Sequence, residues 1–302
     1  MTNFARTFGQ DLMRGEHTVG GGKMLDSKQK LAPGGGGGGC WLGGPKTAST
    51  EKFTTTPAGL IRGEIPNYDG AEREQSGTSI FDPVLTELLY RWFCPPGGLI
   101  LDPFAGGSVR GIVASVLGFQ YAGFELRPEQ VAANRQQAAD ICPDNPPAWH
   151  TGDSAVEVPL WAGQADFAFS CPPYGDLEVY SDGADDLSAM PHGEFLVAYR
   201  AIIAATVAKL KPDSFAAFVV GDFRCKKGFY RNFVGETVAA FEAAGARLYN
   251  EAILVTAVGS LPIRVGKQFK AGRKLGKTHQ NILVFCKGDP KKATDRIEGR
   301  AA

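Results

Sequence analysis

Short apolar strands alternate with amphipathic helices from about residue 78 to 288, and this alternation constrains the fold more than any other feature. The pattern opens with apolar residues at helical spacing between Phe81 and Phe93 and continues through five strand–helix steps. Repeated steps of this kind predict parallel strands in a doubly wound sheet. The expected strands cover 99–102, 121–125, a stretch ending near 153, 165–170, 214–222, 246–257 and 281–288.

The last two expected strands, 246–257 and 281–288, follow one another with no helix predicted between them. Consecutive strands joined without a crossover helix pair as an antiparallel hairpin. The sequence therefore predicts an α/β fold whose seven-stranded sheet is mostly parallel and ends in an antiparallel strand.

The first 65 residues differ in composition from the rest of the chain. Twelve of the 39 glycines fall within 15–44, and six of them form the run 34–39. Such a segment buries too little apolar surface to offset the conformational entropy lost on ordering. We therefore expect a flexible Gly-rich segment over 1–65, one catalytic domain over 66–290 and a flexible tail over 291–302.

The overall charge and the cysteine spacing exclude several classes of protein. Thirty-two Lys and Arg balance 32 Asp and Glu, so the chain cannot bind nucleic acid through its net charge alone. No apolar stretch approaches the ~18 residues of a membrane span, and the N-terminus lacks the apolar core of a signal peptide. The six cysteines lack the spacing of a zinc site. We expect a protein of a reducing cytoplasm, with no membrane partner and no metal.

The segment LDPFAGG, residues 101–107, joins an expected strand to an expected helix through two glycines. Glycine lets the backbone approach a ligand, and a helix N-terminus offers unpaired N–H groups. Glu125 ends the next strand, 23 residues after Asp102, where a nucleotide-binding βαβ unit carries the acid that binds ribose hydroxyls. This turn matches neither the G-x-G-x-x-G pattern nor the P-loop, so NAD and NTPs are not the first choices. The alternative is an ordinary tight turn with a surface acid.

The segment SCPPY, residues 170–174, directly follows another expected strand. A Pro-Pro pair stiffens a loop at the carboxyl end of the sheet, where open α/β folds bind ligands. Tyr174 would stack on a planar base, and a carbonyl of the loop would accept a hydrogen bond from the amino group of that base. Taken alone, the Pro-Pro pair is as readily a structural turn.

Together, LDPFAGG and SCPPY resemble motifs I and IV of the DNA amino-methyltransferases, which use S-adenosylmethionine (SAM) to methylate an exocyclic amine of adenine or cytosine. The resemblance runs from about 78 to 288 and is closest to phage and prophage enzymes, which the stretch CPPYGDLEVYSD also resembles. It implies the class I SAM-methyltransferase (Rossmann-like) fold, with seven strands and the last one antiparallel.

The resemblance also implies which residues form the site. Glu125 would hold the ribose hydroxyls of SAM, and Asp153 would lie near its adenine ring. The cofactor-binding set would be Phe81, Asp102, Pro103, Phe104, Ala105, Gly106, Gly107, Glu125 and Asp153. The catalytic set would be Ser170, Cys171, Pro172, Pro173 and Tyr174.

Cys171 departs from the family motif, which usually has Asp, Asn or Ser at this place. A thiol accepts hydrogen bonds weakly, and its likeness to serine slightly favours cytosine N4 over adenine N6 as the target. Cys171 could also be a nucleophile, or do no chemistry while a proline carbonyl accepts. Two other functions stay open: a related enzyme acting on RNA or a protein glutamine, and a homologue that binds SAM without catalysis.

Basic residues are concentrated late in the chain: 252–287 holds seven Lys and Arg and no acid, whereas 136–199 holds eleven acids and no Lys or Arg. A flexible basic loop between the last two strands would contact DNA phosphates, although a solvated surface loop is the alternative. Without a separate recognition domain, loops 175–193, 223–230 and 258–280 would read the target. The expected nucleic-acid-binding residues are Arg224, Lys226, Arg264, Lys267, Lys270, Arg273, Lys274 and Lys277.

Overall fold

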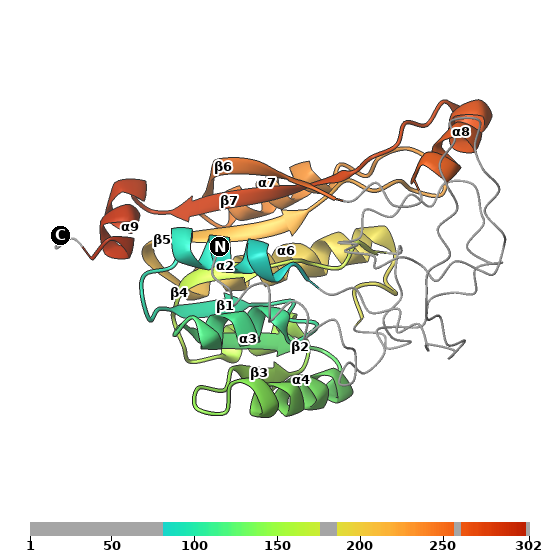
Figure 1. The fold of residues 1–302 in the computed structure, drawn as a ribbon. Coiled ribbons are helices and arrows are strands. Elements are labelled where there is room, and N and C mark those ends of the chain that lie inside the picture. The colour runs from blue at the N-terminus through green and yellow to red at the C-terminus, as the bar shows by residue number, and fades with distance from the viewer. Residues whose placement is uncertain (1–80, 176–185, 257–260, 300–302) are drawn as a thin grey trace, which may run out of the picture.

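The computed structural model describes residues 81–175, 186–256 and 261–299. Predictions for the Gly-rich segment and the domain boundary at 65 lie outside these residues. Seven strands form one sheet in the order β3-β2-β1-β4-β5-β7-β6 (Figure 1). Their bounds are β1 Leu99–Asp102, β2 Gln120–Glu125, β3 Ala148–Thr151, β4 Ala165–Ser170, β5 Leu210–Val220, β6 Arg247–Val255 and β7 His279–Lys287.

The strand directions confirm the predicted fold class. Strands β3, β2, β1, β4 and β5 pair in parallel, whereas β7 runs antiparallel to both β5 and β6. A mostly parallel seven-stranded sheet whose last strand is antiparallel is the class I SAM-methyltransferase fold. All carboxyl ends of the parallel strands therefore meet at one edge, where open α/β sheets bind their ligands.

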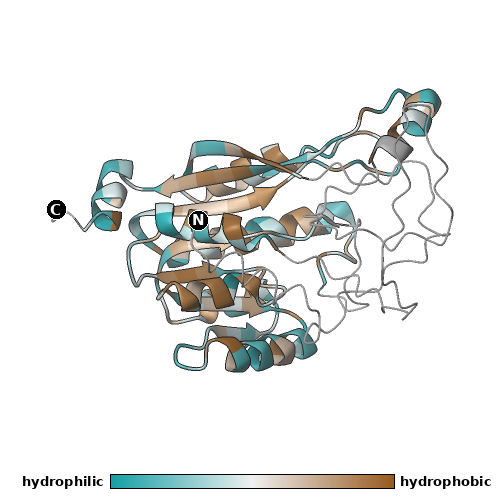
Figure 2. Ribbon diagram, viewed as in Figure 1, coloured by the Kyte–Doolittle hydropathy of each residue, from teal (hydrophilic) through white to brown (hydrophobic). Residues whose placement is uncertain are grey.

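Helices cover both faces of the sheet, and the side-chain alternation of the strands explains how. In β5, Phe215, Ala217 and Val219 pack with one helix layer, while Ala216, Phe218 and Val220 pack with the other. Figure 2 shows apolar strands between helices that are apolar on one side. One layer contains α2 Pro83–Phe93, α3 Val109–Val116, α4 Pro128–Ile141 and α9 Pro290–Ile297, and the other contains α5 Ser154–Leu160, α6 His192–Lys209 and α7 Phe233–Ala243.

Three helices were not predicted from the sequence. Helix α5 lies between β3 and β4, and it is only seven residues long with Pro159 inside it. Helix α8, Leu261–Gly272, lies between β6 and β7, where a loop was expected. Its glycines favour a loop when they are read locally, because glycine is a poor helix former. The antiparallel pairing of β6 with β7 was correct, but the connection between them is helical.

The third helix, α9, corrects the prediction of a flexible tail over 291–302. Asp289 caps it by accepting hydrogen bonds from the Lys291 and Lys292 N–H groups, and Pro290 takes the first turn. Arg296 donates to the Asp166 carboxylate at 2.6 Å and so ties the helix to the start of β4. This tertiary contact holds in place a polar segment that local sequence patterns assign to a tail. Within the residues that the structure describes, no helix combines the length and hydrophobicity needed to cross a membrane.

Candidate cofactor and catalytic site

Asp102, the last residue of β1, is fully buried and surrounded by hydrogen-bond donors. Its carboxylate accepts from Arg110 Nε at 2.6 Å, Tyr121 Oη at 2.7 Å and Ser170 Oγ at 2.5 Å. Burial opposes the charge on Arg110, but the facing Asp102 carboxylate outweighs it and raises the pKa of the guanidinium. The predicted place of Asp102 in the cofactor set stays a prediction, because the donors found around its carboxylate are groups of the protein itself. Its oxygens are used inside the protein, where they join three elements of the site.

Arg110 also holds the turn that follows Asp102, and sequence reasoning did not assign it a role. Its Nη2 donates to the carbonyl oxygens of Phe104 at 2.6 Å and Ala105 at 3.0 Å. Its guanidinium lies under the ring of Phe81, 4.7 Å from the ring centroid. Asn134 Nδ2 donates to the Gly106 carbonyl at 2.8 Å. The backbone of the Gly turn is thus fixed from inside before any ligand binds.

The outer face of this turn is open. Gly106 has a φ of +53°, a conformation that favours glycine. A Cβ added at Gly106 or Gly107 would have no described atom within 4 Å. Ser108 precedes α3, but its hydroxyl donates to Gln137, and no side chain of the described residues caps the helix. The N–H groups at the start of α3 therefore border an open, glycine-lined surface.

Glu125 lies beside the turn, as the sequence predicted. Its Oε2 accepts from the Gly106 N–H at 3.0 Å, and its Oε1 accepts from the Arg127 N–H at 3.1 Å and from Arg127 Nε at 3.2 Å. The side chain is 12% exposed. Burial raises the pKa of Glu125, and Arg127 partly opposes that shift. The carboxylate is thus held at the turn with a small part of it still accessible.

The residues that follow β3 also lie at the carboxyl edge of the sheet. Asp153 caps α5 by accepting from the Ala155 N–H at 2.9 Å. The Ser154 hydroxyl, which sequence reasoning missed, donates to the Pro103 carbonyl at 2.5 Å and joins α5 to the Gly turn. Asp-Ser at a helix start is a capping signal, but nothing in it identifies Pro103 as the partner. The ends of β1, β2 and β3 therefore meet around the turn.

The SCPPY loop is connected to the Gly turn through Ser170. Its side chain is fully buried, and it accepts from the Phe104 N–H at 3.1 Å while donating to Asp102. A direct catalytic role for Ser170 is therefore not supported, because the hydroxyl faces the protein interior. Cys171 and Pro173 are half-buried and Pro172 is buried.

Tyr174 is arranged differently from the prediction. Its ring is 6% exposed and meets Phe223 and Phe233 edge-on, with centroid distances of 6.1 Å and 5.9 Å. Its hydroxyl accepts a hydrogen bond from the Gln280 amide on β7. The ring is thus packed into the aromatic cluster under α6 and α7 and is not presented for stacking on a base. A Pro-Pro-Tyr pattern does not reveal such burial.

Replacing Ser170 by Ala should lower the free energy of unfolding by ~1–3 kcal/mol, because the charged Asp102 would lose a buried hydrogen bond. Ser214→Ala is a matched control: that buried hydroxyl donates only to the neutral Lys211 carbonyl, at 2.7 Å. Equilibrium urea unfolding would measure both variants. Equal losses for the two would contradict a special role for Ser170 in holding Asp102.

The two predicted basic clusters lie together. A Cβ added at Gly228 would be 3.0 Å from the side chain of Lys274, so the 224–230 segment touches the chain that follows α8. Lys277 Nζ donates to the Asp222 carbonyl at 3.3 Å, and burial lowers its pKa. A Cβ at Gly221 would lie 3.4 Å from Lys277 Nζ and 3.8 Å from Tyr174 Oη. The basic residues therefore reach the SCPPY loop.

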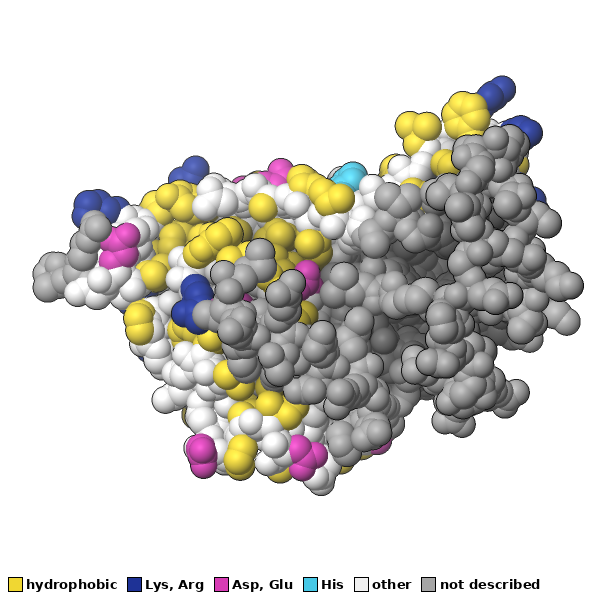
Figure 3. Space-filling view, viewed as in Figure 1, with side chains coloured by type: hydrophobic (Ala, Val, Ile, Leu, Met, Phe, Trp, Pro, Cys, Tyr) yellow, Lys and Arg dark blue, Asp and Glu magenta, His cyan; other side chains and the backbone are white. Residues whose placement is uncertain are grey.

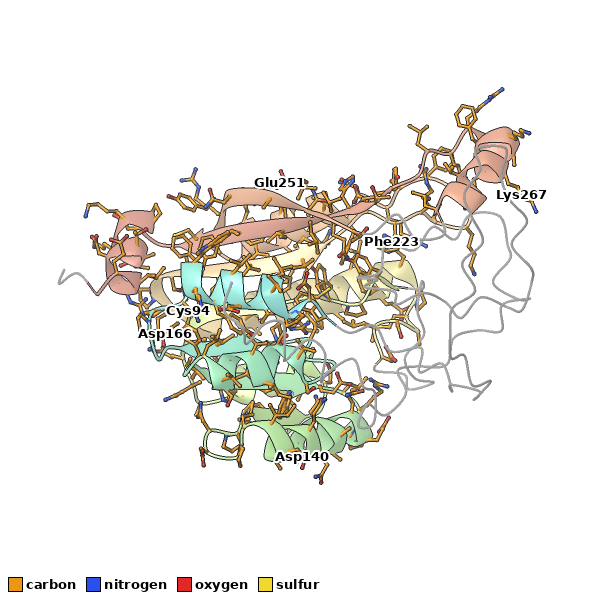
Figure 4. All side chains as sticks on the ribbon, viewed as in Figure 1. Cys94, Asp140, Asp166, Phe223, Glu251 and Lys267 are labelled. Carbon is orange, nitrogen blue, oxygen red and sulfur yellow. The ribbon has the colours of Figure 1, made fainter. Side chains whose placement is uncertain are left out.

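Helix α8 projects beyond the sheet and carries basic side chains at its outer end (Figure 3). Lys267 and Phe223, both labelled in Figure 4, lie on the same side of the molecule. Lys270 is also exposed on α8, Arg264 lies on the same helix, and the Arg273 guanidinium covers the Phe269 ring at 5.0 Å. Most of the predicted basic residues thus form one surface, which we call the basic surface: Arg224, Lys226, Lys267, Lys270, Arg273, Lys274 and Lys277.

Comparisons with known proteins give structural similarity only. No family model matches the chain, and no curated protein sequence does. TrmN from Thermus thermophilus shares 17% identity over 68% of this chain, with a TM-score of 0.45, and this chain spans about half of it, 48%. Magnesium protoporphyrin IX methyltransferase from Synechocystis PCC 6803 with bound SAM shares 12% over 68% of this chain and 79% of its own, with a TM-score of 0.44.

A TehB-like SAM-dependent methyltransferase from Corynebacterium glutamicum shares 17% identity over 70% of this chain and 90% of its own, with a TM-score of 0.42. These proteins share less than a fifth of their residues with this chain, so its fold class rests on strand order and direction. By that criterion the chain has the class I SAM-methyltransferase fold, with a preorganised turn and a stiff Pro-Pro loop at the carboxyl edge of the sheet.

Proposed function

We propose that this chain is a SAM-dependent methyltransferase that methylates the exocyclic amine of cytosine or adenine in DNA. The contact of the Glu125 carboxylate with the Gly106 N–H, at 3.0 Å beside an open turn, supports this proposal most strongly. Ser170 and Asp102 connect that turn to the SCPPY loop. A cofactor site and a candidate substrate loop are therefore parts of one hydrogen-bonded unit.

The residues at the turn fit SAM. The open face at Gly106 and Gly107 would admit the cofactor, and the start of α3 would receive its carboxylate. Glu125 would accept hydrogen bonds from the ribose hydroxyls, and Asp153 would border the adenine. SAM supplies a methyl group bonded to a positively charged sulfur. The protein contributes binding and orientation through groups that Arg110 and Asn134 already hold in place.

The Pro-Pro loop would orient the target amine. Cys171 is a weak acceptor, so the backbone carbonyls of this loop are the better partners for an amino group. A fixed amine would present its lone pair to the methyl group, and such positioning supplies most of the acceleration in this class of reaction. Tyr174 can stack on the base only after its ring leaves Phe223 and Phe233. In the observed arrangement it supports the loop.

The basic surface favours a nucleic acid over a small molecule as the substrate. Its side chains come from α8, the 273–277 segment before β7 and the 224–230 segment, and Lys277 brings it up to the SCPPY loop. Lys and Arg gathered on one surface are typical of proteins that contact the phosphates of a nucleic acid. A protein glutamine needs no such surface.

The decisive experiment is incubation of the purified protein with methyl-labelled SAM and unmethylated duplex DNA, followed by digestion and mass spectrometry of the nucleosides. We expect labelled N4-methyldeoxycytidine or N6-methyldeoxyadenosine. Parallel reactions with total RNA and with a protein extract would test the alternatives. Label in RNA or protein but not in DNA would overturn the assigned substrate. SAM binding without any transfer would indicate a homologue that has lost catalysis.

A further inference from the structure

A tight hairpin follows directly from the carboxyl end of β5. Arg224 and Tyr230 form an isolated antiparallel bridge, and the Arg231 N–H donates to the Phe223 carbonyl at 2.9 Å. The turn is closed by the Gly228 N–H, which donates to the Cys225 carbonyl at 2.8 Å, with Gly228 at a φ of +93°. We call residues 223–231 the hairpin.

Side chains lock the hairpin as well. Arg224 Nη1 donates to the Gly228 carbonyl at 2.8 Å, and the guanidinium covers the Tyr230 ring at 3.9 Å. These contacts span the two arms of the hairpin. The tip is therefore a fixed projection, held by both backbone and side-chain bonds.

Phe229 stands at this tip with 73% of its surface exposed. A single exposed apolar residue is common on protein surfaces and needs no explanation by itself. Here, however, the exposed ring belongs to a residue whose carbonyl closes the turn by accepting from the Cys225 N–H at 2.8 Å, and Lys226 and Lys227 of the same turn are also exposed. An aromatic side chain flanked by cations suits contact with DNA, because the ring can pack against stacked bases while the cations contact phosphates.

The position of the hairpin relates Phe229 to the proposed chemistry. At its base, Phe223 packs against Tyr174, and a Cβ on Gly175 would lie 3.5 Å from the Phe223 ring. At its side, Gly228 touches Lys274 of the basic surface. At ~3.3 Å per residue, Phe229 lies ~7 Å along the chain from Arg231 at that base. Phe229 is thus two residues from Arg231, which bonds to Phe223 at the base of the hairpin, and Phe223 in turn contacts Tyr174 of the SCPPY loop.

We propose that Phe229 is a wedge that enters the DNA duplex beside the target base and fills the gap left when that base swings into the SCPPY loop. This inference rests on the proposed function and adds the element that opens the duplex. Enzymes that modify a paired base must extrude it, and apolar side chains inserted between base steps make room for this. Lys226, Lys227 and Lys274 would hold the flanking phosphates.

The test compares Phe229→Ala on double-stranded and single-stranded DNA. The substrates are a random-sequence oligonucleotide pool, used either single-stranded or annealed to its enzymatically copied complement. We expect Phe229→Ala to lower the initial methylation rate on duplex DNA by about tenfold or more, because extrusion of a paired base loses its wedge. On the single strand the rate should stay within about twofold of wild type, because no pairing has to be broken.

Two further variants make the comparison sharp. Phe229→Trp keeps a large flat ring and should restore most of the duplex rate. Trp92→Ala removes a 60% exposed aromatic from α2, which ends where β1 begins and not at the candidate site, and should change neither rate. Thermal melting of each variant would verify folding, which an exposed side chain should not affect.

Other outcomes overturn the wedge. Equal rates for Phe229→Ala and wild type on both substrates, or equal losses on both, would show that Phe229 does not act in duplex opening. A wild-type protein that methylates only single strands would also overturn the wedge, but the proposed DNA methyltransferase function would stand. A wild-type protein that methylates no DNA would instead overturn the proposed function itself.

Discussion

Replacing Arg110 by Met should lower the free energy of unfolding by ~3–5 kcal/mol, because Asp102 would remain as a buried charge without its cation. The Asp102 side chain is fully buried, and that of Arg110 is 5% exposed. The substitution also leaves two carbonyl oxygens of the Gly turn, Phe104 and Ala105, without their donor. Equilibrium urea unfolding at neutral pH would measure the loss.

Two companion variants identify its cause. Arg91→Met removes an exposed ion pair with Glu87 and should cost less than ~1 kcal/mol. Combining Arg110→Met with Asp102→Asn removes both buried charges and should recover part of the loss. A cost for Arg110→Met no larger than that of Arg91→Met would contradict the view that the Asp102–Arg110 pair organises the site.

Replacing Glu125 by Ala should weaken SAM binding by about 100-fold or more, because two hydroxyl groups would lose a charged acceptor worth ~1.5–3 kcal/mol per hydrogen bond. The Gly106 N–H would also lose its partner, so the turn itself would be held less firmly. Isothermal titration calorimetry with SAM would measure the change. Glu129→Gln, an exposed acid on the first turn of α4, is the control and should bind like wild type. Wild-type affinity in Glu125→Ala would remove Glu125 from the cofactor site.

The pH dependence of SAM binding should follow the same residue. Burial raises the pKa of Glu125, and the ionised form is the better acceptor for ribose hydroxyls. SAM affinity should therefore fall as the pH is lowered through this raised pKa, and Glu125→Gln should lack that step. The effect on stability has the opposite sign. A raised pKa in the folded state favours folding at low pH, and this contribution is lost as the pH rises through the folded-state value.

Local sequence patterns predicted the helices and strands whose apolar residues form a continuous run or recur at helical spacing. The buried runs at 99–102 and 165–170, and the helix from Pro83, matched the structure closely. The pattern failed at α5, α8 and α9, which are short or rich in Gly and Lys. Helix α9 is tied to the sheet by Arg296, which bonds to Asp166 across 130 residues of sequence. Helix propensity within a short window carries no information about such a partner.

The sequence by itself determined the order of most elements, the mostly parallel sheet and the place of Glu125 at the end of β2, because these follow from hydrophobic period and from βαβ connectivity. Only the tertiary structure decided which partners the predicted site residues have within the protein. It placed Asp102 and Ser170 inside a buried network and Tyr174 against Phe223 and Phe233. The physical reason is that a buried polar or aromatic group takes whatever partner the packing supplies, and residues from β1, β2 and β4 become neighbours only when the sheet forms.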